Sequence, residues 1–193
     1  YLIRAQLRAQ AVFPNSSHGA YHSDTFITGE SVETTTIKLA DHARGFDDDS
    51  SPQAVLYTAT QNPYLAGGGG NQGFHNNLRD LTLDVGANQG ASAIDFLGNN
   101  QGGIVRVVLL GQSSRGIGLS LTRGEQGPTL VSKLLVVGFS RGIVTAVTEC
   151  SITFEHIFLR LQTQAAVENE DNTVTFRGLH VLTDLADRPV LVN

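Results

Sequence analysis

The sequence has little of several features that define common classes of protein. Its single cysteine, Cys150, excludes a disulfide within the chain. Only two of its 193 residues are lysines, its arginines are scattered and its net charge is −5. It therefore lacks the basic stripe that a phosphate backbone requires, and we expect no nucleic-acid partner. No apolar run reaches the roughly 18 residues that span a bilayer, so we expect no membrane partner.

The chain also lacks the residue spacings of metal sites. His18 and His22 have the spacing of a zinc pair on a helix, but Pro14 and the polar residues after it disfavour a helix there. The acidic run 47–49 lacks the alternating ligand positions of a calcium loop. We expect no metal and no cofactor.

Methionine is absent, even at position 1, and the chain opens on the strand-like residues 1–7. We expect this sequence to be a fragment of a longer chain, whose remainder supplies further coils or a second domain. The protein is also a candidate homo-oligomer.

What the sequence does contain is a repeat with two markers. The pattern apolar-x-x-apolar-x-apolar starts at Leu78, Ile104, Val131, Phe154 and Phe176, at steps of 26, 27, 23 and 22 residues. The second marker, a small residue or proline followed by an aliphatic residue, places its aliphatic member at Ile94, Ile117, Ile143, Val167 and Val190. These positions step by 23, 26, 24 and 23 residues, so the two markers keep the same period.

A segment of about 24 residues cannot bury its apolar face alone, whereas stacked copies build one continuous core. We therefore predict an all-β fold, a single-stranded right-handed parallel β-helix of about seven or eight coils. It forms one domain over residues 1–193, with entry coils and loops in 1–73 and regular coils in 74–193. Because side chains alternate along a strand, Ile94 and Ile117 are predicted to point inward, and Asp95 and Gly118 outward.

Several segments resemble the β-helix of the pectate-lyase superfamily, in the branch related to glycoside hydrolase families 28 and 55. They are FITGESVETTTIKLAD at 26–41, GFHNNLRDLTLDVGANQGASAIDFLGNNQGGIVRVVLL at 73–110, GIGLSLTRGEQGPTLVSKLLVVGFSRGI at 116–143 and the opening YLI. The resemblance implies a parallel β-helix and an extended sugar chain bound along one sheet. The double aspartate, Gly-His-Gly and Arg-x-Lys signature of polygalacturonases is absent, so the resemblance specifies the fold more closely than the reaction.

Glu125 and Glu149 are the candidate catalytic pair. They follow the second marker on adjacent coils, near the same corner, so they are candidates to share a cleft in which repulsion between like charges raises the pKa of one of them. The alternative is that both are solvated turn residues.

The candidate substrate-binding residues lie on or beside the strands of the second marker: Asp95, Arg115, Arg123, Arg141 and Glu168. The arginines are candidates to bind uronate carboxylates, or alternatively to bond turn carbonyls and neighbouring acids. Asp95 and Glu168 are three coils and about 14 Å apart, too far for an acid–base pair. Asp80 and Asp84 are expected to point outward and to serve solubility.

These observations predict a secreted or cell-surface protein that binds extracellular polysaccharide and that is also a candidate to cleave it, as a glycoside hydrolase or a polysaccharide lyase. The competing interpretation is a non-catalytic structural or adhesive β-helix, such as a tailspike stem or surface protein domain. An enzyme should have a groove with paired acids, whereas a stem should have flat faces or a subunit interface.

Overall fold

The computed structural model describes residues 1–8, 24–58, 73–146, 151–182 and 190–193. Its regular elements in these ranges are all strands. They are β1 (Leu2–Ile3), β2 (Leu7–Arg8), β3 (Phe26–Thr28), β4 (Thr36–Leu39), β5 (Gln53–Thr58), β6 (Asn77–Asp84), β7 (Ala91–Phe96), β8 (Asn99–Leu121), β9 (Gly127–Ala146), β10 (Ser151–Arg160), β11 (Ala165–Glu170), β12 (Thr173–Leu182) and β13 (Leu191–Val192). Within these ranges there is no helix long and apolar enough to cross a bilayer.

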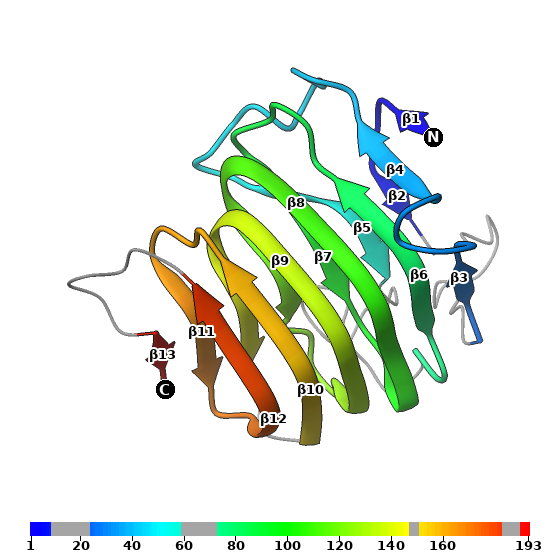
Figure 1. The fold of residues 1–193 in the computed structure, drawn as a ribbon, viewed down its shortest axis with the longest axis vertical. Coiled ribbons are helices and arrows are strands. Elements are labelled where there is room, and N and C mark those ends of the chain that lie inside the picture. Colours follow the sequence, from blue (N-terminus) through cyan, green and yellow to red (C-terminus); the bar gives the residue numbers. More distant parts are fainter. Residues whose placement is uncertain (9–23, 59–72, 147–150, 183–189) are drawn as a thin grey trace, which may run out of the picture.

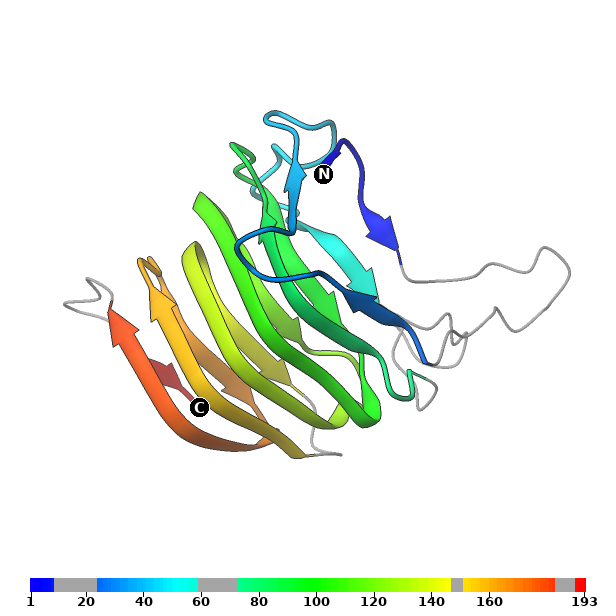
Figure 2. The same cartoon turned by 45° about the vertical axis from the view of Figure 1, so that its right-hand side comes forward.

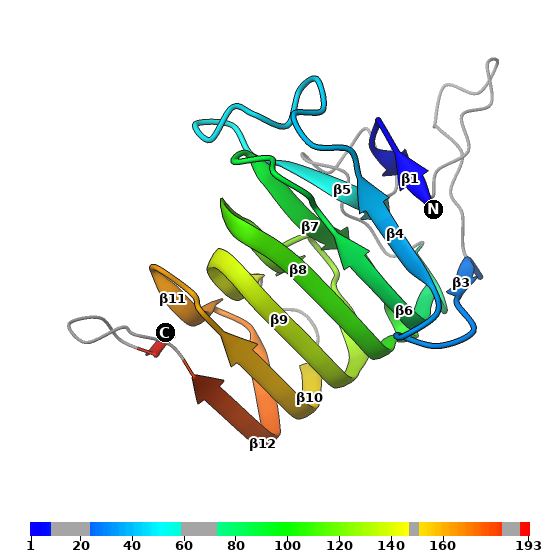
Figure 3. The same ribbon diagram turned by 45° about the horizontal axis from the view of Figure 1, so that its top comes forward.

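The strands form two parallel rows that face each other across a shared core (Figure 1). One row runs β1-β4-β6-β8-β9-β10-β12, with β3 paired to the first part of β6, and the other runs β2-β5-β7-β8-β9-β11-β13. β8 and β9 are long enough to belong to both rows, so a single strand bends around the molecule. Figures 2 and 3 show the strands stacked in this order between the two ends of the chain. The fold is therefore a parallel β-solenoid, as predicted; its handedness and its number of coils remain predictions.

The first marker is confirmed in full. Leu78, Ile104, Val131, Phe154 and Phe176 pair directly from strand to strand and form one column. The second and third apolar positions of the pattern form two more columns in the same register. The members of these columns from β6 to β10 are at most 1% exposed. Those of the terminal strand β12 are partly buried against the same core.

Backbone conformation explains why two residues, and not one, separate the first and second apolar positions of the pattern. The second of these two residues is Asp80, Arg106, Lys133, His156 or Gly178, and each has a positive φ between 53° and 74°. A left-handed residue interrupts the strict alternation of side chains, so the two residues leave the core side and the next apolar residue returns to it. Two short strand segments with a one-residue bend between them therefore replace one straight strand in each of these five coils.

The second marker needs a correction at two positions. The observed column is Ile94, Leu119, Ile143, Val167 and Leu191, so Leu119 replaces the predicted Ile117 and Leu191 replaces the predicted Val190. Ile117 pairs instead with Arg141 and is only partly buried. The corner before it contains register shifts between Leu110 and Ile117, so Leu119 is the residue that reaches the position over Ile94.

The predicted outward position of Gly118 is also wrong. A side chain there would come within 2.3 Å of the core residue Val136, so Gly118 faces inward. The residue beside Asp95 in the outward row is Ser120.

Polar side chains at the corners connect successive coils. The Asn88 amide donates to the carbonyl of Ala40 at 2.9 Å, and the Ser140 hydroxyl donates to the carbonyl of Gly116 at 3.0 Å. Both side chains are 2% exposed. Because a buried carbonyl without a partner is costly, these bonds help to fix the spacing of the coils where the strands are interrupted.

Candidate functional site

The second row of strands presents one outward line of side chains. Arg8, Tyr57, Asp95, Ser120, Val144 and Glu168 pair in succession along β2, β5, β7, β8, β9 and β11. Asp95 and Glu168 are thus separated by two intervening strands, as the sequence predicted, and do not form an acid–base pair.

Asp95 and Arg123 bind each other. The Arg123 guanidinium donates to both carboxylate oxygens of Asp95 and lies 4.7 Å from the centre of the Tyr57 ring. Both charged side chains are less than one fifth exposed. Burial lowers the pKa of Arg123, but the hydrogen bonds and the charge of Asp95 outweigh it and raise the pKa above its usual value, with a smaller contribution from Tyr57. The guanidinium of Arg123 is therefore already bound by Asp95 and Tyr57 of the same chain.

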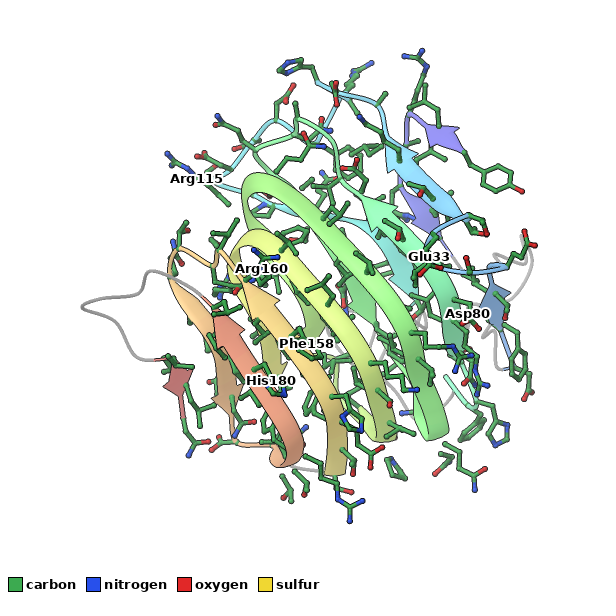
Figure 4. The ribbon with its side chains drawn as sticks, viewed as in Figure 1. Glu33, Asp80, Arg115, Phe158, Arg160 and His180 are labelled. Atoms are coloured by element: carbon green, nitrogen blue, oxygen red, sulfur yellow. The ribbon has the colours of Figure 1, made fainter. Side chains whose placement is uncertain are left out.

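The other two predicted arginines also have carboxylate partners. Arg141 Nη1 lies 3.5 Å from Glu168 Oε1, and Arg115 Nη1 lies 2.7 Å from Asp49 Oδ2. Figure 4 shows Arg115 at the edge of the molecule, far from the labelled residues Glu33 and Asp80. Of the alternatives left open by the sequence, the structure matches the one in which these arginines bond neighbouring acids.

The candidate catalytic pair is only half described. Glu125 is partly buried with a φ of 64°, and its backbone carbonyl accepts a hydrogen bond from the Asn99 side chain of the neighbouring coil. Glu149 lies outside the described residues. The pairing of Glu125 with Glu149 therefore stays a prediction.

A groove of about 400 Å³ lies on the outer face of the first row, on the segments that precede the bend. It crosses four neighbouring strands, β6, β8, β9 and β10. At about 4.8 Å per strand, this corresponds to about 14 Å along the solenoid axis. Its lining includes Asn77 and Arg79 of β6, Gly103 and Val105 of β8, Leu130 of β9, and Ser151 and Thr153 of β10.

The groove lining includes a glycine in an outward row. Asn77, Gly103, Leu130 and Thr153 pair in succession, and only Gly103 has no side chain. A Cβ atom built at Gly103 would lie 3.2 Å from Asn77 Oδ1 and 3.3 Å from the Leu130 carbonyl oxygen, which is close contact. A side chain at Gly103 would therefore press on both neighbouring strands, and glycine is the residue that fits between them.

A second cavity, of about 280 Å³, lies on the other side of the bend. It is lined by Ser31, Val32, Glu33, Asp80, Arg106, Val108 and Lys133. Arg106 binds both carboxylate oxygens of Asp80, at 2.8 Å for the Nη2 bond. The hydrogen bonds from Arg106 lower the pKa of Asp80 and outweigh the opposing effect of desolvation, with further lowering by the charges of Arg106 and Arg79. Asp80 is therefore ionised at neutral pH and paired with Arg106 of the next strand.

Neither hollow was identified from the sequence, although both have a signal in the aligned repeats. The residue before the first apolar position is Asn77, Gly103, Leu130, Thr153 or Thr175, and the glycine is the one member without a side chain. The second x of the marker carries opposite charges at Asp80 and Arg106 of successive coils. Comparing repeats position by position finds both features.

The described residues include no group of three or more histidine, cysteine, aspartate or glutamate side chains placed to hold a metal ion. No protein-family model matches the chain. No curated protein sequence matches it either. What defines the class of this protein is therefore its fold, the parallel β-solenoid.

Proposed function

We propose that this chain binds an extended polysaccharide in the groove across β6, β8, β9 and β10. One observation supports the proposal above all others: the groove crosses four consecutive strands of the stack and so continues along the solenoid axis. A site for a small molecule closes around its ligand, whereas a site that continues from coil to coil suits a linear polymer.

The lining has the chemistry that a sugar chain needs. Sugar rings present hydroxyl groups at their edges and C–H groups on their faces. The Arg79 guanidinium and the hydroxyls of Ser151 and Thr153 offer hydrogen bonds, while Val105 and Leu130 offer apolar surface. Arg79 is exposed and its Nη2 already donates to Asn77 Oδ1 at 3.2 Å, which orients the guanidinium beside the groove.

The proposal is one of binding, and cleavage by a hydrolase or lyase mechanism stays a prediction that depends on Glu125 and Glu149. The resemblance to the pectate-lyase superfamily, in the branch related to glycoside hydrolase families 28 and 55, supports a polysaccharide as the ligand. A secreted or cell-surface location is part of the same proposal, because extracellular polysaccharide is found there.

The test is binding of a panel of soluble polysaccharides to the wild-type chain and to variants that fill the groove. Gly103→Val on β8 and Thr153→Trp on β10 add side-chain volume to its lining and should each weaken binding at least about tenfold, which corresponds to about 1.4 kcal/mol. Gly124→Val is the matched control, because a Cβ atom at Gly124 meets nothing within 4 Å. Thermal melting checks that each variant is folded.

The proposal is overturned if the wild-type chain binds no polysaccharide of the panel. Unchanged affinity in both filled variants would overturn it equally, because the ligand would then lie elsewhere. Assaying the same mixtures for new reducing ends and for unsaturated products measures hydrolysis and lysis separately.

One observation favours the structural or adhesive alternative. On the segments that follow the bend, two outward rows contain Val108 and Leu135, and Leu110 and Val137, all only partly buried. Phe158 extends the first of these rows and is 45% exposed. Such an apolar sheet face is typical of an interaction surface. A concentration-dependent oligomer in light scattering, combined with no polysaccharide binding, would favour this alternative.

A further inference from the structure

Two charged side chains of the 280 Å³ cavity have no partner among the residues that the structure describes. Neither the Lys133 ammonium group nor the Glu33 carboxylate makes an ion pair or a side-chain hydrogen bond within the described ranges of the chain. Both side chains are exposed. Figure 4 shows Glu33 and Asp80 on the same side of the molecule, beside β6.

The stacking of the coils explains why Lys133 is unpaired. The bend residues Asp80, Arg106 and Lys133 belong to successive strands, so Lys133 lies two strand spacings from Asp80, about 10 Å. Arg106 stands between them and occupies both oxygens of Asp80. The cavity therefore has a neutral ion pair in its lining and two groups of opposite charge that remain available to a ligand.

This combination matches a single neutral sugar ring. Ring hydroxyls can donate to the Glu33 carboxylate and accept from the Lys133 ammonium, and Val32 and Val108 offer apolar surface to a C–H face. Because the cavity contains two acids and two bases, its net charge is zero, and it does not favour an anionic or a cationic ligand.

The cavity and the groove are neighbours along the strands. Arg79 and Val105 line the groove, and the residues that follow them, Asp80 and Arg106, line the cavity. The left-handed bend turns the backbone between these consecutive residues. From Val105 to Val108 is three residues, at most about 10 Å at 3.3 Å per residue. A substituent of one or two sugar rings covers that distance.

We propose that the cavity binds a sugar branch of the polysaccharide whose main chain lies in the groove, so that the protein selects a branched, neutral polymer over its linear counterpart. This inference rests on the proposed function. It assigns a role to the unpaired Glu33 and Lys133 that the groove alone does not give them.

The test compares linear and branched polymers with the same main chain: mannan with galactomannan, and xylan with arabinoxylan. The wild-type chain should bind the branched member of at least one pair about tenfold more tightly. The double variant Glu33→Gln and Lys133→Met keeps the side-chain sizes and removes both charges. It should lose that preference and keep the affinity for the linear member.

The matched control is Glu170→Gln with Arg44→Met, which makes the same change of charge at two exposed positions that do not line the cavity. It should keep the preference. Equal affinity of the wild-type chain for the linear and branched polymers overturns this inference and leaves the groove proposal intact. A preference that survives in the Glu33 and Lys133 double variant also overturns it. Wild-type chain that binds none of the polymers overturns the proposed function itself.

Discussion

Two phenylalanines in one strand should respond very differently to replacement by alanine. Phe154 and Phe158 are four residues apart in β10, so a strand with strict alternation would place them on the same face. The bend at His156, with a φ of 54°, separates them. Phe154 is fully buried, whereas Phe158 is 45% exposed on the outer face (Figure 4).

The expected loss of stability follows from these environments. Phe154 stacks on Phe176 of the next coil with ring centres 4.7 Å apart and an interplanar angle of 10°. Removing a buried phenylalanine costs about 3 to 5 kcal/mol, of which the stacked ring pair supplies about 0.5 to 1.5 kcal/mol. Phe158→Ala leaves no cavity in the core, and its stack on His180, 4.6 Å between ring centres, lies in solvent, so we expect a loss below about 1 kcal/mol.

The assay is equilibrium unfolding in urea, with the free energy of unfolding extrapolated to zero denaturant. Comparable losses for Phe154→Ala and Phe158→Ala would refute the reasoning, because they would place both rings in equivalent environments. A larger loss for Phe158→Ala would refute it more strongly, since it would reverse the assigned faces.

Three further outcomes are expected. Gly178→Ala should lower the free energy of unfolding by about 1 to 2 kcal/mol, because alanine is strained at a φ of 74°, whereas His156→Gly at the equivalent bend should not lower it; thermal or urea melts measure both. The pKa of Asp80 is held below 3.8 in the folded chain, so its contribution to stability is present above pH 3.8 and is lost as the pH falls through the lowered pKa of the folded state. Asp80→Asn should flatten this part of the pH profile of stability, and an unchanged profile would contradict the assignment. Arg123→Ala should cost about 1 to 3 kcal/mol because it leaves the carboxylate of Asp95 partly buried without its partner, and Asp95→Asn in the same variant should recover part of that loss.

The fold was predictable from sequence because a solenoid repeats its core pattern in every coil. The apolar columns that begin at Leu78, Leu81 and Leu83 were predicted with the correct register throughout, since three apolar positions per coil leave one alignment that keeps them all inside. The error at Ile117 arose where the corner contains register shifts that no apolar position marks. Corner length is set by backbone geometry and hydrogen bonds, which a hydrophobic pattern does not report.

The candidate site was less predictable. Asp95, Arg115, Arg123, Arg141 and Glu168 were selected for their position on or beside one row of strands. A guanidinium that faces outward binds whichever carboxylate the neighbouring coil brings within reach, and those partners are distant in sequence: Arg123 binds Asp95, and Arg115 binds Asp49. The groove escaped notice because Gly103 in its lining has no side chain and stands out only when the repeats are compared position by position.

Hydrogen–deuterium exchange of the chain with and without a bound polysaccharide tests the central claim most directly. The groove proposal predicts that the ligand slows exchange together in residues 101–105, 128–130 and 151–153, which belong to consecutive coils and line one groove. Slower exchange confined to a single coil, or found instead in 91–96 and 165–170 on the other row of strands, would contradict it.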